Sequence, residues 1–252
     1  MMNKWRKAFA VFFLGMLGVL HGSADQFQIP DTTRQLILCI TDDWSSSKGD
    51  LTLWERQENE PWNDIEKADV RLGKKGIAWG LGIHPEPLTS HVKREGDGRA
   101  PAGVFEIGGV YGYGTGDSVE RNERVAYKQV GEGDLWVEDV TSVHYNRYLR
   151  WPADMPMNAW SRKQQMRLND EAHSLKLFIG HNAGPDIVPG RGSAIFFHIW
   201  REEGQRPSIG CTTMGERALR KLIAWIDPEK EPLYVLLPKD EYEKLRWTWL
   251  LP

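Results

Sequence analysis

Near its end, the chain of 252 residues contains the stretch Gly192-Ser193-Ala194-Ile195-Phe196-Phe197-His198-Ile199-Trp200. An apolar run of this length next to turn-forming residues indicates a strand in the centre of a β-sheet. The run carries one histidine. The stretch Pro207-Ser208-Ile209-Gly210-Cys211-Thr212 follows and places a cysteine thirteen positions after that histidine. A buried strand and a tight turn are therefore expected to carry the two side chains.

A thiol needs a nearby base or cation to be a good nucleophile at neutral pH, and an imidazole is the usual partner. We therefore predict that Cys211 is a nucleophile and that His198 is its base and general acid. Gly210 allows a sharp turn and, with Cys211, is expected to direct an N–H at an oxyanion. Ser208 either hydrogen-bonds near the sulfur or only begins the turn. The alternatives are an inert turn cysteine and a histidine satisfied in the core.

The rest of the chain is predicted to form short strands separated by turns rich in Gly, Pro, Asp and Asn. These strands are expected at residues 35–41, 51–56, 69–72, 104–107, 135–140, 174–179, 193–199 and 233–237. One clear helix, residues 215–226, has its apolar side chains at i, i+3, i+4 and i+7 and ends at Asp227-Pro228. The fold class is thus mainly β, a β-rich α+β fold. The glycine-rich residues 108–114 lack a phosphate-loop lysine and are interpreted as a flexible flap near a cleft.

The first residues have the pattern of a targeting signal. Three lysines or arginines occur among the first seven positions, residues 8–20 are apolar, and residues 22–24 are small. This indicates a cleavable signal peptide over residues 1–24, with an uncleaved anchor as the alternative. We expect one exported domain, residues 25–252, in the periplasm or cell envelope.

Composition excludes several classes of function. The formal net charge of −3 gives no basic footprint for nucleic acid. The histidines lack partners at metal-ligand spacing, so no metal site and no cofactor is expected.

Of the two cysteines, Cys39 lies in an apolar strand-like run, which favours a buried free thiol over a Cys39–Cys211 disulfide, although the disulfide stays an alternative.

Three segments carry a resemblance to a known family. Ala100-Pro101-Ala102-Gly103-Val104-Phe105 is similar to a Thr-Pro-x-Gly-x-Phe turn, residues 188–198 to a strand that ends on a catalytic histidine, and residues 207–211 to a nucleophile turn. Together they resemble the L,D-transpeptidase catalytic domain (YkuD-type), in the branch with a short His-to-Cys loop. One departure is that Ile209 stands where the family motif Ser/Thr-His-Gly-Cys has a second histidine.

The resemblance implies a mostly antiparallel β-sandwich or sheet, with the nucleophile on a turn that leads into a helix. It implies that the cysteine attacks peptidoglycan stem peptides at the amide between a diamino acid and D-alanine. D-alanine leaves, a thioester remains, and an amine of another stem peptide resolves it, which crosslinks the cell wall. The expected partners are thus stem peptides, with no nucleic acid, no membrane beyond the signal peptide, and a monomeric chain.

Four further residues are candidates for substrate binding. His181 and Asn182 precede a Gly/Pro-rich loop and either line the cleft or form an ordinary polar turn. Tyr145 and Arg147 either meet a substrate carboxylate or end a solvated strand. Ile209 either walls the cleft or packs beneath the nucleophile turn. We expect Ile209→Ala to act mainly through packing and to cost about 2–5 kcal/mol of stability.

Two other functions remain open from the sequence. The same cysteine and histidine could use water as the acceptor, which would make the protein an L,D-carboxypeptidase or amidase. The chain could also be a non-catalytic cell-wall-binding protein with oxidised cysteines, in which tryptophans stack on glycans; there are 12 tryptophans.

Overall fold

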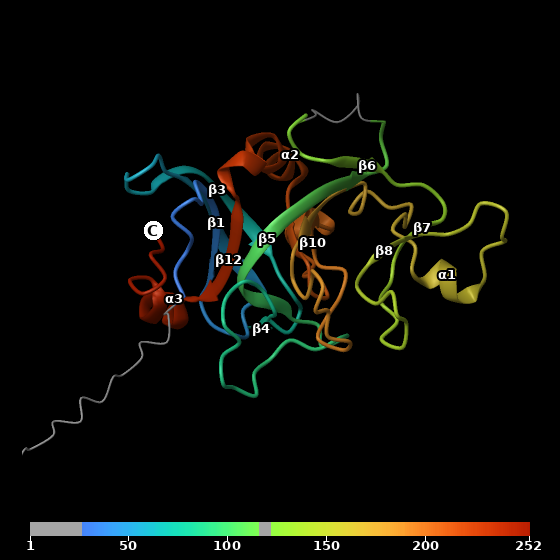
Figure 1. Cartoon of the computed structure of the whole chain (residues 1–252), viewed down its shortest axis with the longest axis horizontal. Helices are drawn as coiled ribbons and strands as arrows, with labels where there is room; N and C mark the ends of the chain where they lie inside the picture. Colours follow the sequence, from blue (N-terminus) through green and yellow to red (C-terminus); the bar gives the residue numbers. More distant parts are fainter. Residues whose placement is uncertain (1–26, 116–121) are drawn as a thin grey trace, which may run out of the picture.

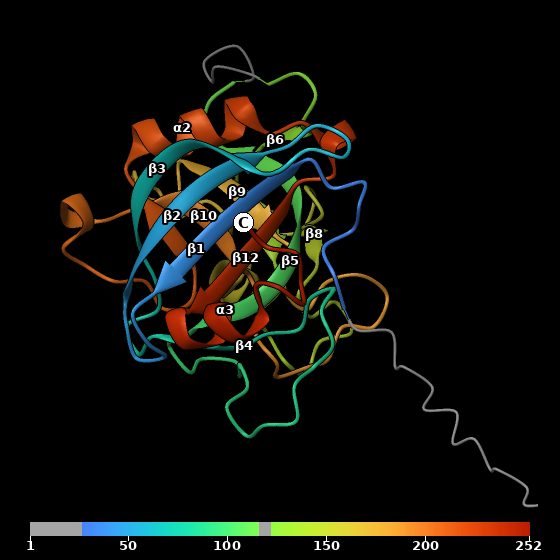
Figure 2. The same cartoon turned by 90° about the vertical axis from the view of Figure 1, so that its left-hand side faces the viewer.

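Strand β12 (Leu233–Pro238) closes the sheet, because it pairs in parallel with β1 (Gln35–Thr41) and antiparallel with β5 (Ala100–Gly112). The computed structural model describes residues 27–115 and 122–252, so the expected signal peptide lies outside the described residues. Around the wall of the described barrel the strands follow the order β12, β1, β2 (Lys48–Glu55), β3 (Asn63–Arg71), β11 (Thr212–Met214), β10 (Phe196–Ile199), β9 (Leu175–Ile179) and β5. Figure 2 shows β3, β2, β1, β12 and β5 side by side. The prediction of a mainly β fold is confirmed.

The remaining elements add to this barrel at its edges and ends. Strands β4 (Ile77–Trp79) and β6 (Tyr127–Gln129) pair in parallel with β5, and β7 (Asp134–Trp136) pairs with β8 (Tyr148–Arg150) as a separate two-stranded ribbon. The ribbon and the short helix α1 (Ala159–Lys163) lie on the side of the molecule away from β1 and β2 (Figure 1). The described residues also include the 3₁₀ turns η2 (Glu202–Gly204) and η3 (Pro228–Lys230).

Helix α2 (Glu216–Trp225) matches the helix predicted from the apolar spacing. Leu219, Leu222 and Ile223 are its buried side chains, and the helix packs against β10. It ends where Asp227 accepts a hydrogen bond from the Glu229 N–H to begin the η3 turn. A further helix, α3 (Lys239–Leu245), follows β12 directly. Within the described ranges, no helix has the length and apolar character needed to cross a membrane.

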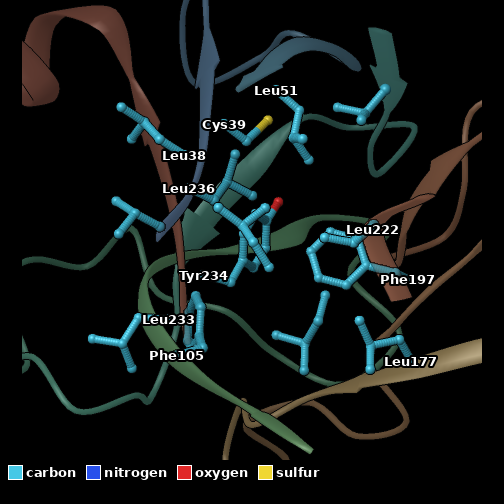
Figure 3. Packing of buried hydrophobic residues seen from close by; sticks show 14 of the residues in the cluster. Leu38, Cys39, Leu51, Phe105, Leu177, Phe197, Leu222, Leu233, Tyr234 and Leu236 are labelled. Atoms are coloured by element: carbon cyan, nitrogen blue, oxygen red, sulfur yellow. The ribbon is translucent and has the colours of Figure 1, made fainter. Parts of the chain in front are cut away.

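The barrel interior is filled by aromatic and branched side chains from opposite walls (Figure 3). At its centre the ring of Tyr234 lies 4.7 Å from that of Phe197, and its hydroxyl is 2.9 Å from Oγ1 of Thr212, a residue that is 1% exposed. Cys39 belongs to the same cluster, and both Cys39 and Cys211 are free thiols. The alternative of a structural disulfide is therefore wrong.

One local interpretation from the sequence is also wrong. Most of the glycine-rich segment 108–114, interpreted as a flap, belongs to β5 and pairs with both β6 and β9. The glycines serve close packing instead: a Cβ at Gly108 would come within 2.7 Å of the Phe178 ring, and one at Gly112 within 2.7 Å of the Tyr127 hydroxyl oxygen. A change of register between Ile107 and Val110 bends the strand there.

The interior hydrogen bond of Tyr234 leads to a stability prediction. Tyr234→Phe leaves the buried Thr212 hydroxyl without its partner, so the free energy of unfolding in urea should fall by about 1–3 kcal/mol. Adding Thr212→Val should restore most of that loss, because neither polar group then remains. Tyr127→Phe, which removes a half-buried hydroxyl bonded to the Gly114 carbonyl, is the control and should cost less. An unchanged unfolding midpoint for Tyr234→Phe would contradict this account.

Candidate active site

The outer faces of β9, β10 and β11 form the floor of the site. Side chains alternate along a strand, so Phe197 and Ile199 enter the barrel core while His198 faces outward. The register places His198 directly opposite Lys176 on β9 and Thr213 on β11. His198 is 6% exposed and Lys176 4%. One row across three strands thus carries an imidazole and an ammonium group.

The turn before β11 presents Cys211 on the same face. Thr212 bonds Tyr234 inside the barrel, so its neighbours Cys211 and Thr213 lie on the outside. Ser208 Oγ accepts from the Gly210 N–H at 3.0 Å and donates to the Cys211 carbonyl at 2.5 Å. The serine thus braces the turn, and the Gly210 N–H is engaged within it.

Cys211 and His198 are held as separate neutral groups. The Cys211 S–H donates to the Ala194 carbonyl at 3.5 Å, and the His198 Nδ1–H donates to the Ile199 carbonyl at 2.8 Å, which leaves the ring lone pair on Nε2. Burial raises the pKa of the Cys211 thiol to about 11 and lowers the pKa of His198 to about 3. No direct hydrogen bond joins the two side chains among the described residues, so the resting site holds a thiol and a neutral imidazole.

A cavity of about 600 Å³ opens over these two residues. Its lining combines buried and exposed charges. Glu138 is an exposed residue of the lining, and desolvation of its carboxyl together with the charge of Glu95 raises the pKa of Glu138 to about 7. Burial lowers the pKa of Lys176 to about 8, and its Nζ donates to the Met166 carbonyl at 2.7 Å. The other cations of the lining are Lys74, Lys93, Arg201 and Arg206.

Asn146 holds together the β7–β8 ribbon and the segment that leads into β10, beside the cavity. It has a positive φ of 53° and is 3% exposed. Its Oδ1 accepts from the Trp136 indole N–H at 2.8 Å and from the Ala194 N–H at 3.0 Å. Its Nδ2 donates to the His181 and Asn182 carbonyls at 3.1 and 2.7 Å. All four hydrogen-bonding positions of this amide are therefore used to join the β7–β8 ribbon to the segment that enters β10.

The family model for YkuD, the L,D-transpeptidase catalytic domain, matches residues 47–235. The chain belongs to this family. The matched range includes His198, Cys211 and the strands that carry them. Neither a curated protein nor a solved structure matches the chain.

In this L,D-transpeptidase domain the four candidate substrate-binding residues are not part of the cavity lining. His181 is 1% exposed; its Nδ1 accepts from the Leu81 N–H at 3.2 Å and its Nε2 donates to the Arg191 carbonyl at 2.9 Å. It therefore offers no free ring nitrogen to the cysteine. Asn182 bonds the Val188 N–H and carbonyl and closes the loop that precedes β10.

The other two candidates differ in exposure: Tyr145 is 2% exposed, whereas Arg147 lies at the surface. The Tyr145 hydroxyl donates to the Glu95 carboxylate and accepts from the Gly192 N–H at 3.2 Å. Tyr145 therefore contacts the cavity indirectly, through Glu95, which belongs to the lining. Arg147 is exposed, and its Nη2 is 3.5 Å from the Gly184 carbonyl. Both positions connect loops around the site.

Sequence reasoning missed Glu138, Lys176 and His173, all of which line the cavity. Lys176 could have been found, because it is the charged residue within the otherwise apolar strand β9. Glu138 and His173 lie in irregular segments after β7 and before β9, and no local pattern marks their side chains as part of the site.

The neutral resting pair predicts how the alkylation rate of Cys211 depends on pH. With a thiol pKa of about 11, alkylation by iodoacetamide should keep rising through the alkaline range, because the thiolate fraction grows about tenfold per pH unit below the pKa. Intact mass at short reaction times gives the rate. Cys211→Ala is the control and should stay unlabelled, since Cys39 is buried. A plateau at neutral pH would instead show a preformed thiolate–imidazolium pair.

Ile209 corrects an expectation from the sequence. Its side chain is 75% exposed and lines the cavity, so it does not pack beneath the turn. The stability cost of about 2–5 kcal/mol expected for a buried isoleucine therefore does not apply.

Ile209→Ala should change the unfolding free energy by less than about 0.5 kcal/mol, as surface substitutions usually do. Because the residue forms part of the wall, the variant should raise KM for a stem peptide more than it lowers kcat. Thermal unfolding and steady-state kinetics measure the two effects. Exposed Leu168, also in the lining, provides a matched apolar truncation. A melting point lowered by many degrees would show that the side chain is buried in solution.

Proposed function

We propose that this L,D-transpeptidase-family protein is an exported cysteine acyltransferase that acts on peptidoglycan stem peptides and crosslinks them. The observation that carries the proposal is that Cys211, on the turn before β11, and His198, on the adjacent β10, line one cavity of about 600 Å³ in the family's catalytic domain. Export rests on the amino-terminal sequence pattern.

The neutral pair fits a proton transfer that accompanies attack. His198 Nε2 takes the thiol proton as Cys211 Sγ bonds to the carbonyl carbon of the scissile amide. The imidazolium then gives this proton to the leaving nitrogen, the C–N bond breaks, and D-alanine departs with its amine. A thioester on Cys211 remains, with atoms and charge balanced.

The charges of the cavity support an anionic peptide as substrate. Lys74 and Arg206 are exposed cations of the lining, and a stem peptide ending in D-alanine presents a free carboxylate. Glu138 is an acidic group in the same cavity and suits an ammonium group, which the diamino acid of the stem supplies.

The decisive experiment incubates the mature protein with purified muropeptides and identifies the products by mass spectrometry. Crosslinked dimers with D-alanine release are expected; trimmed tripeptides alone would indicate the carboxypeptidase alternative, and unchanged substrate would indicate a binding protein. Cys211→Ala should abolish the products while the melting temperature stays within a few degrees. Cys39→Ala is the matched control, and its folded fraction should remain active.

A further inference from the structure

A second imidazole, that of His173, stacks on the His198 ring at the cavity floor. The rings of His173 and His198 are stacked with centroids 4.6 Å apart and planes at 26°. His173 precedes β9 and His198 lies on β10, and both belong to the cavity lining. The His173 side chain is 19% exposed. It is therefore reachable from the space over Cys211.

The orientation of His173 is fixed by a carboxylate. Its Nδ1 lies 2.8 and 3.0 Å from the two oxygens of Asp170, which can only accept, so Nδ1 carries the proton and Nε2 carries the lone pair. Arg201 Nη2 donates to the same carboxylate at 2.5 Å. No hydrogen-bond partner of Nε2 occurs in the described part of the chain. A base oriented by a third group is the arrangement found around activated nucleophiles.

The charges around His173 keep it available as a neutral base. Burial lowers its pKa, Asp170 raises it, and Lys176 and Arg201 lower it. His173 in turn lowers the pKa of His198, so two protons on the stacked pair are unfavourable. The stacked pair therefore carries one proton at a time, so a proton accepted by one imidazole must leave before the other accepts the next.

We infer that His173, oriented by Asp170, is the general base that deprotonates the acceptor in the second half-reaction. The inference rests on the proposed function and assigns the acceptor to the class of primary ammonium groups. The ammonium proton passes to His173 Nε2 and then to solvent. The amine bonds to the thioester carbon, and the C–S bond breaks. The attacking nitrogen gives its second proton through His198 to the departing Cys211 thiolate, which yields an amide and a thiol.

The test separates the two half-reactions in His173→Gln. Single-turnover release of D-alanine reports acylation, and dimer formation from stem tetrapeptide reports resolution. Acylation should stay within about threefold of the wild type, whereas dimer formation should fall about 100-fold or more, the usual contribution of a general base. Hydroxylamine, which is already unprotonated at neutral pH, should resolve the acyl-enzyme of the variant at the wild-type rate. His144→Gln, which changes an exposed histidine outside the cavity lining, is the control.

Asp170→Asn supplies a second readout that keeps the ring. Because Asp170 raises the pKa of His173, the acid limb of dimer formation should move to lower pH in this variant. If His173→Gln slows acylation, dimer formation and hydroxylamine resolution equally, the residue only supports His198 and the inference is wrong. If the wild type forms no acyl-enzyme on Cys211, the proposed function itself fails.

Discussion

The site depends on strand β10 being buried on both of its faces. Phe197 packs against Tyr234 in the barrel, while on the other face the ring of Phe196 lies 5.0 Å from that of Trp136 in the ribbon. Alternation along the strand then places His198 on the outer face, where it is nearly inaccessible to water. A buried polar group must be hydrogen-bonded, and the adjoining Ile199 carbonyl meets this need. The same burial that builds the strand thus fixes the tautomer of His198.

Residues that act through local order could be predicted from the sequence. The apolar run around His198 indicates a buried strand, and the small residues before Cys211 indicate a tight turn. The helix after them follows from its apolar spacing. Residues brought in by long-range pairing could not. Lys176 reaches the site because β9 pairs with β10 in one register, and Glu138 and His173 because irregular segments cover the outer face. No periodicity in the chain encodes which irregular segment lies over which strand.

Residues 108–114 and Ile209, whose surroundings were predicted wrongly, show a second limit of prediction from the sequence. Glycines at 108–114 indicate close approach of the backbone, but the sequence does not say whether solvent or a neighbouring strand lies there; Phe178 and Tyr127 occupy that space. Ile209 is apolar, and burial is the usual inference for such a side chain, yet a turn that binds the β3–β4 connection through its backbone leaves this side chain outside. The Ser208 N–H donates to the Leu72 carbonyl, and the Ser208 carbonyl accepts from the Lys74 N–H, both at 2.8 Å. Backbone anchoring therefore decides the exposure of Ile209.

A common electrostatic trend runs through the floor of the cavity. Burial raises the pKa of Cys211 and lowers the pKa of His198 and Lys176, so each of these groups is shifted toward its neutral form. Charge that develops during attack is costly in such a place unless a proton moves at the same time. The exposed cations of the lining, by contrast, remain hydrated and can meet a carboxylate at little cost. Under the proposed function the cavity would divide the work: charged groups near solvent would orient the peptide, and groups held near neutrality would transfer protons where the bond is made.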